Sequence, residues 1–480
     1  MKTYLKNIFW LLAAMICITS CDQEEVTDVN NVITTDGKIP VRIEITVDGV
    51  ITRASSEAGY TTGDGLYDKR DEVTVAAFAN EGYELVRFYN KNGDASQQDA
   101  SSYTFYADVP LTFKAEFGRK HTITVTASPT EGGTVSGGGK YGYGKSCTIS
   151  AIANAGYAFD GWYEGSTKIS SETNYTFTVS SSRTITGKFK LARFLIAGEE
   201  GYIVTIMGTN PTVAVDIKQI GKNAWNAITY GNEKYVAVGY DSYITYSIDG
   251  VIWESPSHTS WGTDYIRIAY GNGRFAIVKE PSTAATVSVT SDFIDYNGSL
   301  YESGSFVYDI AYGKNKFVGV GSRGGLGIAY VLNDGSSKWS SYYKVRVGSI
   351  KSIIFDGNQF VTLNNSGYVS TSSNGTSWSE QGYTGTYFLT NMAYGNGIYV
   401  GCGDGGYVSM SSDCAIWTTP KQIGTNKWLA VTYGGGLFLM VGEKGYISSS
   451  SDGVNWTTPK QIQYGDGNVL TVNLNDIFLQ

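Results

Sequence analysis

The sequence predicts an all-β protein: two small tandem β modules followed by a closed ring of seven four-stranded sheets, with six sheets as the alternative. Composition supports this, because 59 Gly and 36 Tyr against 8 Pro in 480 residues favour many short strands joined by glycine turns. A segment near the N-terminus occurs twice, and a unit of about 40 residues recurs through the rest of the chain.

Residues 1–20 are predicted to be a signal peptide. Two lysines precede an apolar run from Ile8 to Ile18, which is too short to cross a membrane and ends in small polar residues. The stretch Ile18-Thr19-Ser20-Cys21 resembles a bacterial lipobox, and this resemblance implies that Cys21 becomes the lipidated first residue of an outer-membrane lipoprotein. The alternative is an ordinary signal peptide that happens to precede a cysteine.

Residues 21–40 lack hydrophobic periodicity and are predicted to be a flexible tether. Its acidic cluster at residues 22–25 resembles the surface-export signal of certain bacterial lipoproteins, which implies exposure on the cell surface. The alternative is a solvated tether that carries no address, with the anchor facing the periplasm.

Net charge argues against nucleic acid as a partner. Removal of residues 1–20 takes Lys2 and Lys6 away, so 34 of the 36 basic residues remain against 44 acidic ones, a net charge of −10. Three cysteines remain beyond Cys21, at unrelated spacings that predict neither a disulfide framework nor a zinc site. Cys402 and Cys414 are expected to be buried free thiols.

Two β modules are predicted over residues 41–118 and 119–190. The segments VTVAAFANEGYELVRFY (73–89) and CTISAIANAGYAFDGWY (147–163) share Ala-Asn-x-Gly-Tyr after an alternating strand. The second segment resembles the divergent internalin B-repeat of bacterial surface proteins, and the first has Arg87-Phe88 where the second has Gly161-Trp162. This resemblance implies a stalk or spacer that can also bind partners. The aromatic residues at strand spacing are expected to be core.

A propeller is predicted over residues 191–480. A Tyr-Gly or related turn recurs at separations of 40, 42, 43, 39 and 39 residues, beginning at positions 230, 270, 312, 355, 394 and 433. In the unit 223–256 the segments AITYG, KYVAVG, YITYS and VIWES, the last at 251–255, are expected to be four antiparallel strands. A sheet with two apolar faces is not stable alone, so the ring must close.

The two ends of the propeller are predicted to share one sheet. Residues 193–203, RFLIAGEEGYI, match 437–447, LFLMVGEKGYI, so the propeller begins at a second strand. Residues 216–221 match the outermost strand near 420–424, and residues 470–480 match the innermost strand LAVTYGGGLFLM. The N-terminal and C-terminal pieces therefore complete one sheet, which removes free edges.

A Ser-x-Asp-Gly-x-x-Trp box recurs between the third and fourth strands. Its Asp or Asn is expected to accept hydrogen bonds from backbone N–H groups, its Gly to supply positive φ, and its Trp to pack between sheets. The box resembles the Asp-box, or BNR repeat, of sialidases, although it is one residue shorter between Asp and Gly. The resemblance implies structural turns on the face away from a catalytic pocket. The boxes comprise Ser247, Asp249, Trp253, Ser372, Asn374, Trp378, Ser411, Asp413, Trp417, Ser450, Asp452 and Trp456, with variants at 290–296 and 333–339.

Sialidase chemistry is not predicted. The propeller has five arginines and no Arg-Ile-Pro signature, and Arg267 and Arg274 are expected at exposed or inter-sheet positions. Only two histidines exist: His121 opens a strand, and His258 is placed in a connector between sheets. No metal, cofactor or catalytic residue is therefore predicted.

The turns opposite the boxes are the predicted ligand site, because they vary while the frame repeats. Trp225 and Trp428 are expected to be core. The leading hypothesis is a lipid-anchored adhesion protein that binds a glycan or a protein at the cell surface. The alternatives are a divergent glycoside hydrolase or lyase, and a structural component of the surface. The binding candidates are Tyr240, Asp241, Trp261, Arg323, Asn365, Tyr387, Asp404 and Lys444.

Overall fold

The computed structural model describes residues 36–52, 55–91, 100–208, 214–258, 262–280, 283–296, 298–385, 389–464 and 466–479. The predicted signal peptide and Cys21 lie outside these residues, as does the tether up to residue 35. The tether was expected to extend to residue 40, but the first strand already begins at Ile39. Regular structure in the described residues consists of β-strands and single 3₁₀ turns. None of the described segments forms a helix of the length and apolarity needed to cross a membrane.

The first module is built from two sheets that enclose an aromatic core. In one sheet β1 pairs in parallel with β9, and β7 pairs with β9 in antiparallel fashion; the other has the order β3-β4-β6-β8. Phe88, Phe113 and Phe117 are buried between them. The strands are β1 (Ile39–Val47), β2 (Val50–Thr52), β3 (Ser55–Ser56), β4 (Gly59–Thr62), β5 (Gly65–Tyr67), β6 (Glu72–Ala79), β7 (Tyr83–Asn90), β8 (Ser102–Tyr106) and β9 (Leu111–Ser128).

The second module repeats this plan. The later part of β9 pairs in parallel with β16, β13 pairs with β16, and a second sheet has the order β10-β12-β15. Trp162 is fully buried, as Phe88 is in the first module. Strand β9 runs without a break through residues 118 and 119, where one module was expected to end and the next to begin. The further elements are η1 (Thr130–Gly132), β10 (Gly133–Ser136), β11 (Gly139–Gly142), β12 (Ser146–Ala153), β13 (Tyr157–Glu164), β14 (Thr167–Ser170), β15 (Asn174–Thr178) and β16 (Arg183–Leu191).

From residue 193 onward the described residues form seven sheets of four strands each. Each sheet is named here by its innermost strand. The first three are the β44 sheet, with β17 (Arg193–Gly198), β18 (Tyr202–Met207), β19 (Ala214–Gln219) and β44 (Leu474–Leu479); the β20 sheet, with β20 (Trp225–Gly231), β21 (Lys234–Gly239), β22 (Tyr243–Ser247) and β23 (Ser257–His258); and the β24 sheet, with β24 (Tyr265–Gly271), β25 (Arg274–Lys279), β26 (Ala284–Thr290) and β27 (Leu300–Ser303).

The other four follow the same order from the innermost strand outward. They are the β28 sheet, with β28 (Ser305–Gly313), β29 (Lys316–Arg323), β30 (Leu326–Asn333) and β31 (Tyr343–Val347); the β32 sheet, with β32 (Ile350–Phe355), β33 (Phe360–Asn364), β34 (Tyr368–Ser372) and β35 (Ser379–Tyr383); the β36 sheet, with β36 (Leu389–Gly395), β37 (Ile398–Gly403), β38 (Tyr407–Ser411) and β39 (Lys421–Gln422); and the β40 sheet, with β40 (Trp428–Gly434), β41 (Leu437–Gly442), β42 (Tyr446–Ser450) and β43 (Lys460–Gln461).

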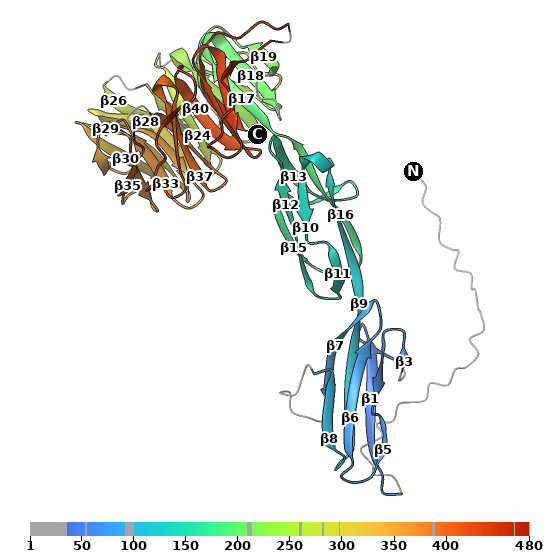
Figure 1. Cartoon of the computed structure of the whole chain (residues 1–480). Coiled ribbons are helices and arrows are strands. Elements are labelled where there is room, and N and C mark those ends of the chain that lie inside the picture. The colour runs from blue at the N-terminus through green and yellow to red at the C-terminus, as the bar shows by residue number, and fades with distance from the viewer. Residues whose placement is uncertain are drawn as a thin grey trace, which may run out of the picture. The chain divides into compact units, whose positions relative to one another are not determined.

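The ring is closed by the last strand of the chain. β44 pairs with β17, with Leu195 opposite Phe478, so the two ends share one sheet as their matching sequences predicted. Each innermost strand contacts the next, and β44 contacts β20. In Figure 1 the green strands β17 and β18 lie beside the red C-terminal strands. This arrangement confirms the predicted all-β propeller.

The outermost strands differ from the prediction. Residues 251–255 were expected to form the fourth strand of the β20 sheet, but this strand is β23, which begins at Ser257. The reason is the box: Asp249 accepts backbone hydrogen bonds from Val251 and Ile252, which holds these residues in a turn. The outermost strands after the last two boxes, β39 and β43, are likewise only two residues long.

Candidate functional site

The boxes form closed turns whose polar atoms bind one another. Asp249 Oδ1 accepts hydrogen bonds from Val251 N and Ile252 N, both at 2.8 Å, and from Ser247 Oγ at 3.0 Å. The backbone donors hold the pKa of Asp249 down at about 2, because they favour its ionised form. The same bonds surround Asn374, Asp413, Asp452 and the variant Asp292.

The box tryptophans belong to the packing between sheets. The indole N–H of Trp417 donates to Cys414 O, and that of Trp456 donates to Gly453 O, both at 2.9 Å. Their rings are half-buried against residues of the neighbouring sheet. Cys414 replaces the box glycine, adopts φ 67° and is buried as a free thiol, as Cys402 is. Burial raises the pKa of Cys414 to about 12.

The described binding candidates lie at the opposite end of the sheets from the boxes. Four belong to 3₁₀ turns between second and third strands: η3 (Tyr240–Ser242), η4 (Asp404–Gly406) and η5 (Glu443–Gly445). Arg323 ends β29, and Asn365 follows β33. The six residues are distributed over five sheets, so the structure does not gather them into one pocket. Trp261 and Tyr387 lie outside the described residues.

Three of these residues bond to a neighbouring sheet, Arg323 and Asp404 through their side chains and Lys444 through its backbone. Arg323 Nη1 lies 2.6 Å from Glu302 Oε1 on the outermost strand of the β24 sheet, and this hydrogen bond raises the pKa of Arg323. Asp404 Oδ1 lies 2.8 Å from Lys427 Nζ, just before β40. The backbone N–H of Lys444 donates to a side chain before β44. These candidates therefore already take part in contacts between neighbouring sheets of the ring.

A pocket of about 330 Å³ lies at the same end, between the β44 and β20 sheets. We call it the Trp225 pocket. Trp225 is 1% exposed, which agrees with its expected place in the core, and its indole N–H donates to Ile220 O at 3.1 Å. Tyr243 and Pro256 are half-buried, whereas Lys222 is exposed. The lining consists of Ile220, Gly221, Lys222, Asn223, Trp225, Tyr243 and Pro256.

The predicted residues Tyr240 and Asp241 lie close in sequence to this pocket without lining it. Tyr240 is 55% exposed at the tip of η3. Asp241 Oδ2 lies 3.8 Å from His258 Nε2, and the His258 ring lies 5.3 Å from that of Tyr243. His258 was expected in a connector, but it lies in β23 because the box occupies the residues before it.

Sequence reasoning did not select Lys222, Asn223, Tyr243 or Pro256. Their signal was a comparison of repeats: IGKNAW at 220–225 corresponds to IGTNKW at 423–428, with Lys222 in place of Thr425. Pro256 follows the box Trp253 at the spacing that separates Pro459 from Trp456. Of the four residues, Lys222 alone differs in charge from its counterpart in this comparison, so the sequence offered a signal for Lys222 but not for the pocket.

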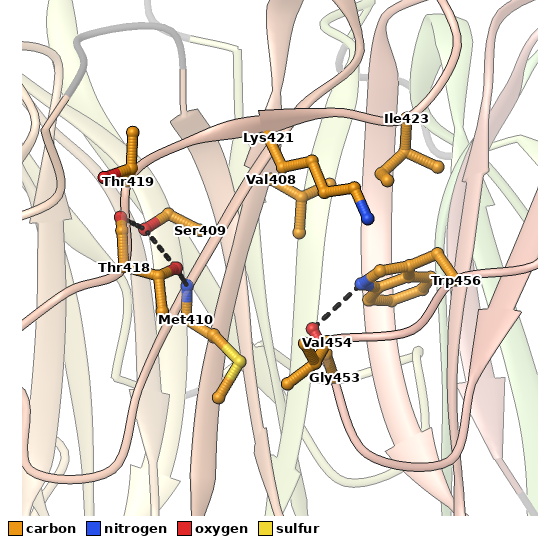
Figure 2. Close-up of a pocket in the computed structure, with 10 residues that line it drawn as sticks. All are labelled: Val408, Ser409, Met410, Thr418, Thr419, Lys421, Ile423, Gly453, Val454 and Trp456. Atoms are coloured by element: carbon orange, nitrogen blue, oxygen red, sulfur yellow. Dashed lines mark hydrogen bonds between the residues drawn. The ribbon is translucent and has the colours of Figure 1, made fainter.

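A second pocket, of about 160 Å³, opens between the β36 and β40 sheets (Figure 2). We call it the Trp456 pocket. Val408, Met410 and Ile423 contribute from one sheet, and the box residues Val454 and Trp456 from the next. Neither this lining nor that of the Trp225 pocket includes a carboxylate, histidine or cysteine.

Two buried carboxylates lie on the innermost strands. Asp309 Oδ2 accepts a hydrogen bond from Ile353 N at 2.8 Å, and Asp476 Oδ2 accepts one from Ile228 N at 3.0 Å, in each case from the next sheet. Arg267 Nε lies 3.6 Å from Asp309 Oδ1, the inter-sheet position that was one of its two expected environments. Burial raises the pKa of Asp309, and it raises that of Asp476 to about 6. Each of these carboxylates therefore links two neighbouring sheets of the ring.

Comparison with known proteins identifies the modules. The model of the divergent InlB B-repeat domain matches residues 50–121 and again residues 123–193. Both modules are B-repeat-like. A search of curated proteins gives no match.

Several solved structures are similar to part of the chain. YCF48 bound to a D1 peptide is 17% identical, covering 53% of this chain and 91% of that one, with a TM-score of 0.39. The computationally designed Ika8 protein is 12% identical, with coverages of 59% and 92% and a TM-score of 0.41. The WD40 β-propeller domain of Doa1 is 14% identical, with coverages of 55% and 87% and a TM-score of 0.41.

Proposed function

We propose that this chain is a non-enzymatic adhesion protein of the cell surface. In this account Cys21 carries a lipid anchor in the outer membrane, the two B-repeat-like modules act as a stalk, and the propeller binds a glycan or another surface macromolecule. The observation that carries the proposal is the Trp225 pocket, an open concave site at the end of the sheets that the boxes leave free.

The chemistry of the pocket suits a polar ligand with an apolar face. Tyr243 and Pro256 offer partly buried apolar surface, while Lys222 and Asn223 bring an ammonium group and an amide to the same pocket. A few polar groups against an apolar wall are typical of small-ligand sites, and a sugar ring presents hydroxyl groups and an apolar face. The pocket therefore supports recognition of one sugar residue or one polar side chain.

Hydrolysis is a less favoured function. A glycoside hydrolase needs two carboxylates across an open pocket, about 5–5.5 Å or about 6.5–9.5 Å apart. The Trp225 and Trp456 pockets have no carboxylate in their linings, and Asp309 and Asp476 are occupied by backbone donors. Release of product from any glycan in a broad panel would favour the enzyme and argue against our proposal.

The test is binding of the full chain carrying Cys21→Ser, which cannot be lipidated, to arrays of glycans and matrix proteins. We expect retention on at least one ligand and a loss of about tenfold or more in affinity with Lys222→Glu, because the ammonium group is replaced by a charge of opposite sign. Thr425→Glu, at the corresponding position of the repeat, should leave binding unchanged. Retention on no ligand would contradict the proposal and favour a purely structural role.

The anchor is tested separately. Cells that express the full chain should incorporate labelled fatty acid into it, and Cys21→Ser should abolish the label. Protease added to intact cells should cut a chain displayed outward and spare one that faces the periplasm. If the Cys21→Ser variant kept both the fatty-acid label and its association with the membrane, a lipid anchor at Cys21 would be ruled out.

A further inference from the structure

The Trp456 pocket arises from a difference between two junctions of the ring. At the junction of the β32 and β36 sheets, the five-residue strand β35 packs closely against the next box, so that a Cβ at Gly382 would lie 2.5 Å from the carbonyl oxygens of Cys414 and Ala415. At the next junction the corresponding strand, β39, has two residues. The shorter strand leaves the pocket open between Met410 and Trp456.

The wall of this pocket formed by Ser409, Met410 and Trp456 is apolar, because the polar atoms of these residues bond within the protein. Trp456 Nε1 donates to Gly453 O at 2.9 Å, and Ser409 Oγ donates to Thr418 O at 2.7 Å. Met410 N donates to Thr418 Oγ1 at 3.1 Å. The apolar surface comes from Val408, Ile423, Val454 and the faces of Met410 and Trp456, and Thr419 and Lys421 complete the rim with Gly453. A cavity of about 150 Å³ lined by aliphatic and aromatic side chains holds benzene, so the volume of this pocket, about 160 Å³, is enough for one six-membered ring.

One cationic group belongs to the lining. Figure 2 shows Lys421 extending across the pocket with its Nζ directed toward Trp456. Within the described parts of the chain no carboxylate forms an ion pair with Lys421, whereas Lys218, on the outermost strand β19, lies 3.5 Å from Asp216. Asp452 is close in sequence to the pocket, but its carboxylate accepts from Val454 N and Asn455 N. Lys421 is therefore available to an anionic ligand.

We infer that the Trp456 pocket binds a small aromatic acid, with its ring against Met410, Val454 and Trp456 and its carboxylate at Lys421 Nζ. The site is separate from the Trp225 pocket and does not depend on the proposed function. Its selectivity has two sources: the volume admits one ring, and the ammonium group favours an anion over a neutral analogue of the same shape.

The experiment compares phenylacetate, the neutral isostere phenylacetamide, and acetate on the full Cys21→Ser chain. Binding is followed by saturation-transfer NMR and by tryptophan fluorescence. We expect phenylacetate to bind about tenfold more tightly than phenylacetamide, and acetate to give no signal. Lys421→Gln should weaken phenylacetate to the level of phenylacetamide. The matched control is Lys460→Gln, at the same position of β43, which should change nothing.

A second variant tests the cavity itself. Val454 is 47% exposed, so Val454→Trp should fill the pocket from its open side without disturbing the fold, and binding of both aromatic probes should disappear. Equal affinity for phenylacetate and phenylacetamide, an unchanged affinity in Lys421→Gln, or no binding of phenylacetate up to its solubility would each overturn the inference. Lys421→Gln should leave array binding intact, which separates this inference from the proposed function.

Discussion

The two ends of the propeller's sheets use acidic residues in opposite ways. In the boxes, Asp249 and its counterparts direct their carboxylates into their own turns, where backbone N–H groups bind them. At the other end, Asp404 pairs with Lys427 of the next sheet, and Lys222 lines an open pocket. The polar atoms of the most regular motif of this chain are therefore architectural, and both ligand sites that we propose lie where one junction of the ring differs from another.

The largest loss of stability is expected for a substitution of Asp309, which lies on an innermost strand rather than at either end of a sheet. Asp309→Ala leaves the buried Ile353 N without its acceptor and the half-buried Arg267 without this partner. The unpaired buried N–H and the broken, partly buried ion pair together should lower the free energy of unfolding by about 3–5 kcal/mol. Urea denaturation of the full chain measures this. A loss smaller than that caused by Asp452→Ala in a box would show that Asp309 does not hold neighbouring sheets together.

The pH dependence of stability should distinguish Asp476 from the box aspartates. Burial raises the pKa of Asp476 from 3.8 to about 6, despite the nearby Arg267. A raised carboxyl pKa means that the folded state holds the proton more tightly, so this stabilisation is present below pH 3.8 and is lost as the pH rises through about 6. Asp249 has the opposite sign: its contribution is present above pH 3.8 and is lost as the pH falls through about 2.

Asp476→Asn tests this difference. Asp309 and Arg267 are the charged groups that act on Asp476, and both remain in the variant. Between pH 4 and pH 7 the stability of the wild type relative to the variant should fall by roughly 2 kcal/mol, most of the effect of a shift of about two pKa units. Denaturation series at several pH values measure it. Parallel curves for the two proteins would contradict the raised pKa.

A smaller loss is expected for one box. Asp452→Ala removes the acceptor of Val454 N and Asn455 N in a half-buried turn, and should cost about 1–2 kcal/mol, as loss of a helix cap does. Asp452→Asn keeps the acceptor oxygen, as Asn374 does in its own box, and should retain most of the stability. Equal losses in both variants would show that charge rather than hydrogen bonding holds the turn.

The smallest effect is expected at the surface pair on the opposite end. Asp404 and Lys427 are 48% and 38% exposed, so Asp404→Ala should lower the free energy of unfolding by less than about 1 kcal/mol. The loss should decrease further in high salt, because exposed charges are screened. A loss of stability as large as that caused by Asp309→Ala would show that the exposed ion pair and the buried carboxylate contribute equally to holding the sheets together.

Much of the fold could be predicted because short-range patterns specify it. The match of residues 193–203 with 437–447 identified the shared sheet, since both segments carry the same turn between a second and a third strand. Residues 251–255 were wrongly predicted as a strand, because hydrophobic alternation there competes with the hydrogen bonds of Asp249. The position of Asp404 and Lys444 within their repeats predicted at which end of a sheet each residue lies. The position of a pocket, however, depends on the gap between two sheets. That gap is set by packing, and the repeat pattern does not contain it.

We propose that the ligand binds at the end of the sheets opposite the boxes. The most direct test of this position introduces one negative charge at each end of the same sheet junction. Lys222→Glu alters the Trp225 pocket, and Ile252→Glu alters a box residue that is 72% exposed at the opposite end. Both are measured in the full Cys21→Ser chain on the glycan and protein arrays. We predict that Lys222→Glu lowers affinity for the bound ligand by about tenfold or more and that Ile252→Glu leaves it unchanged. Retention lost with Ile252→Glu and kept with Lys222→Glu would place the binding site on the box end and contradict the account.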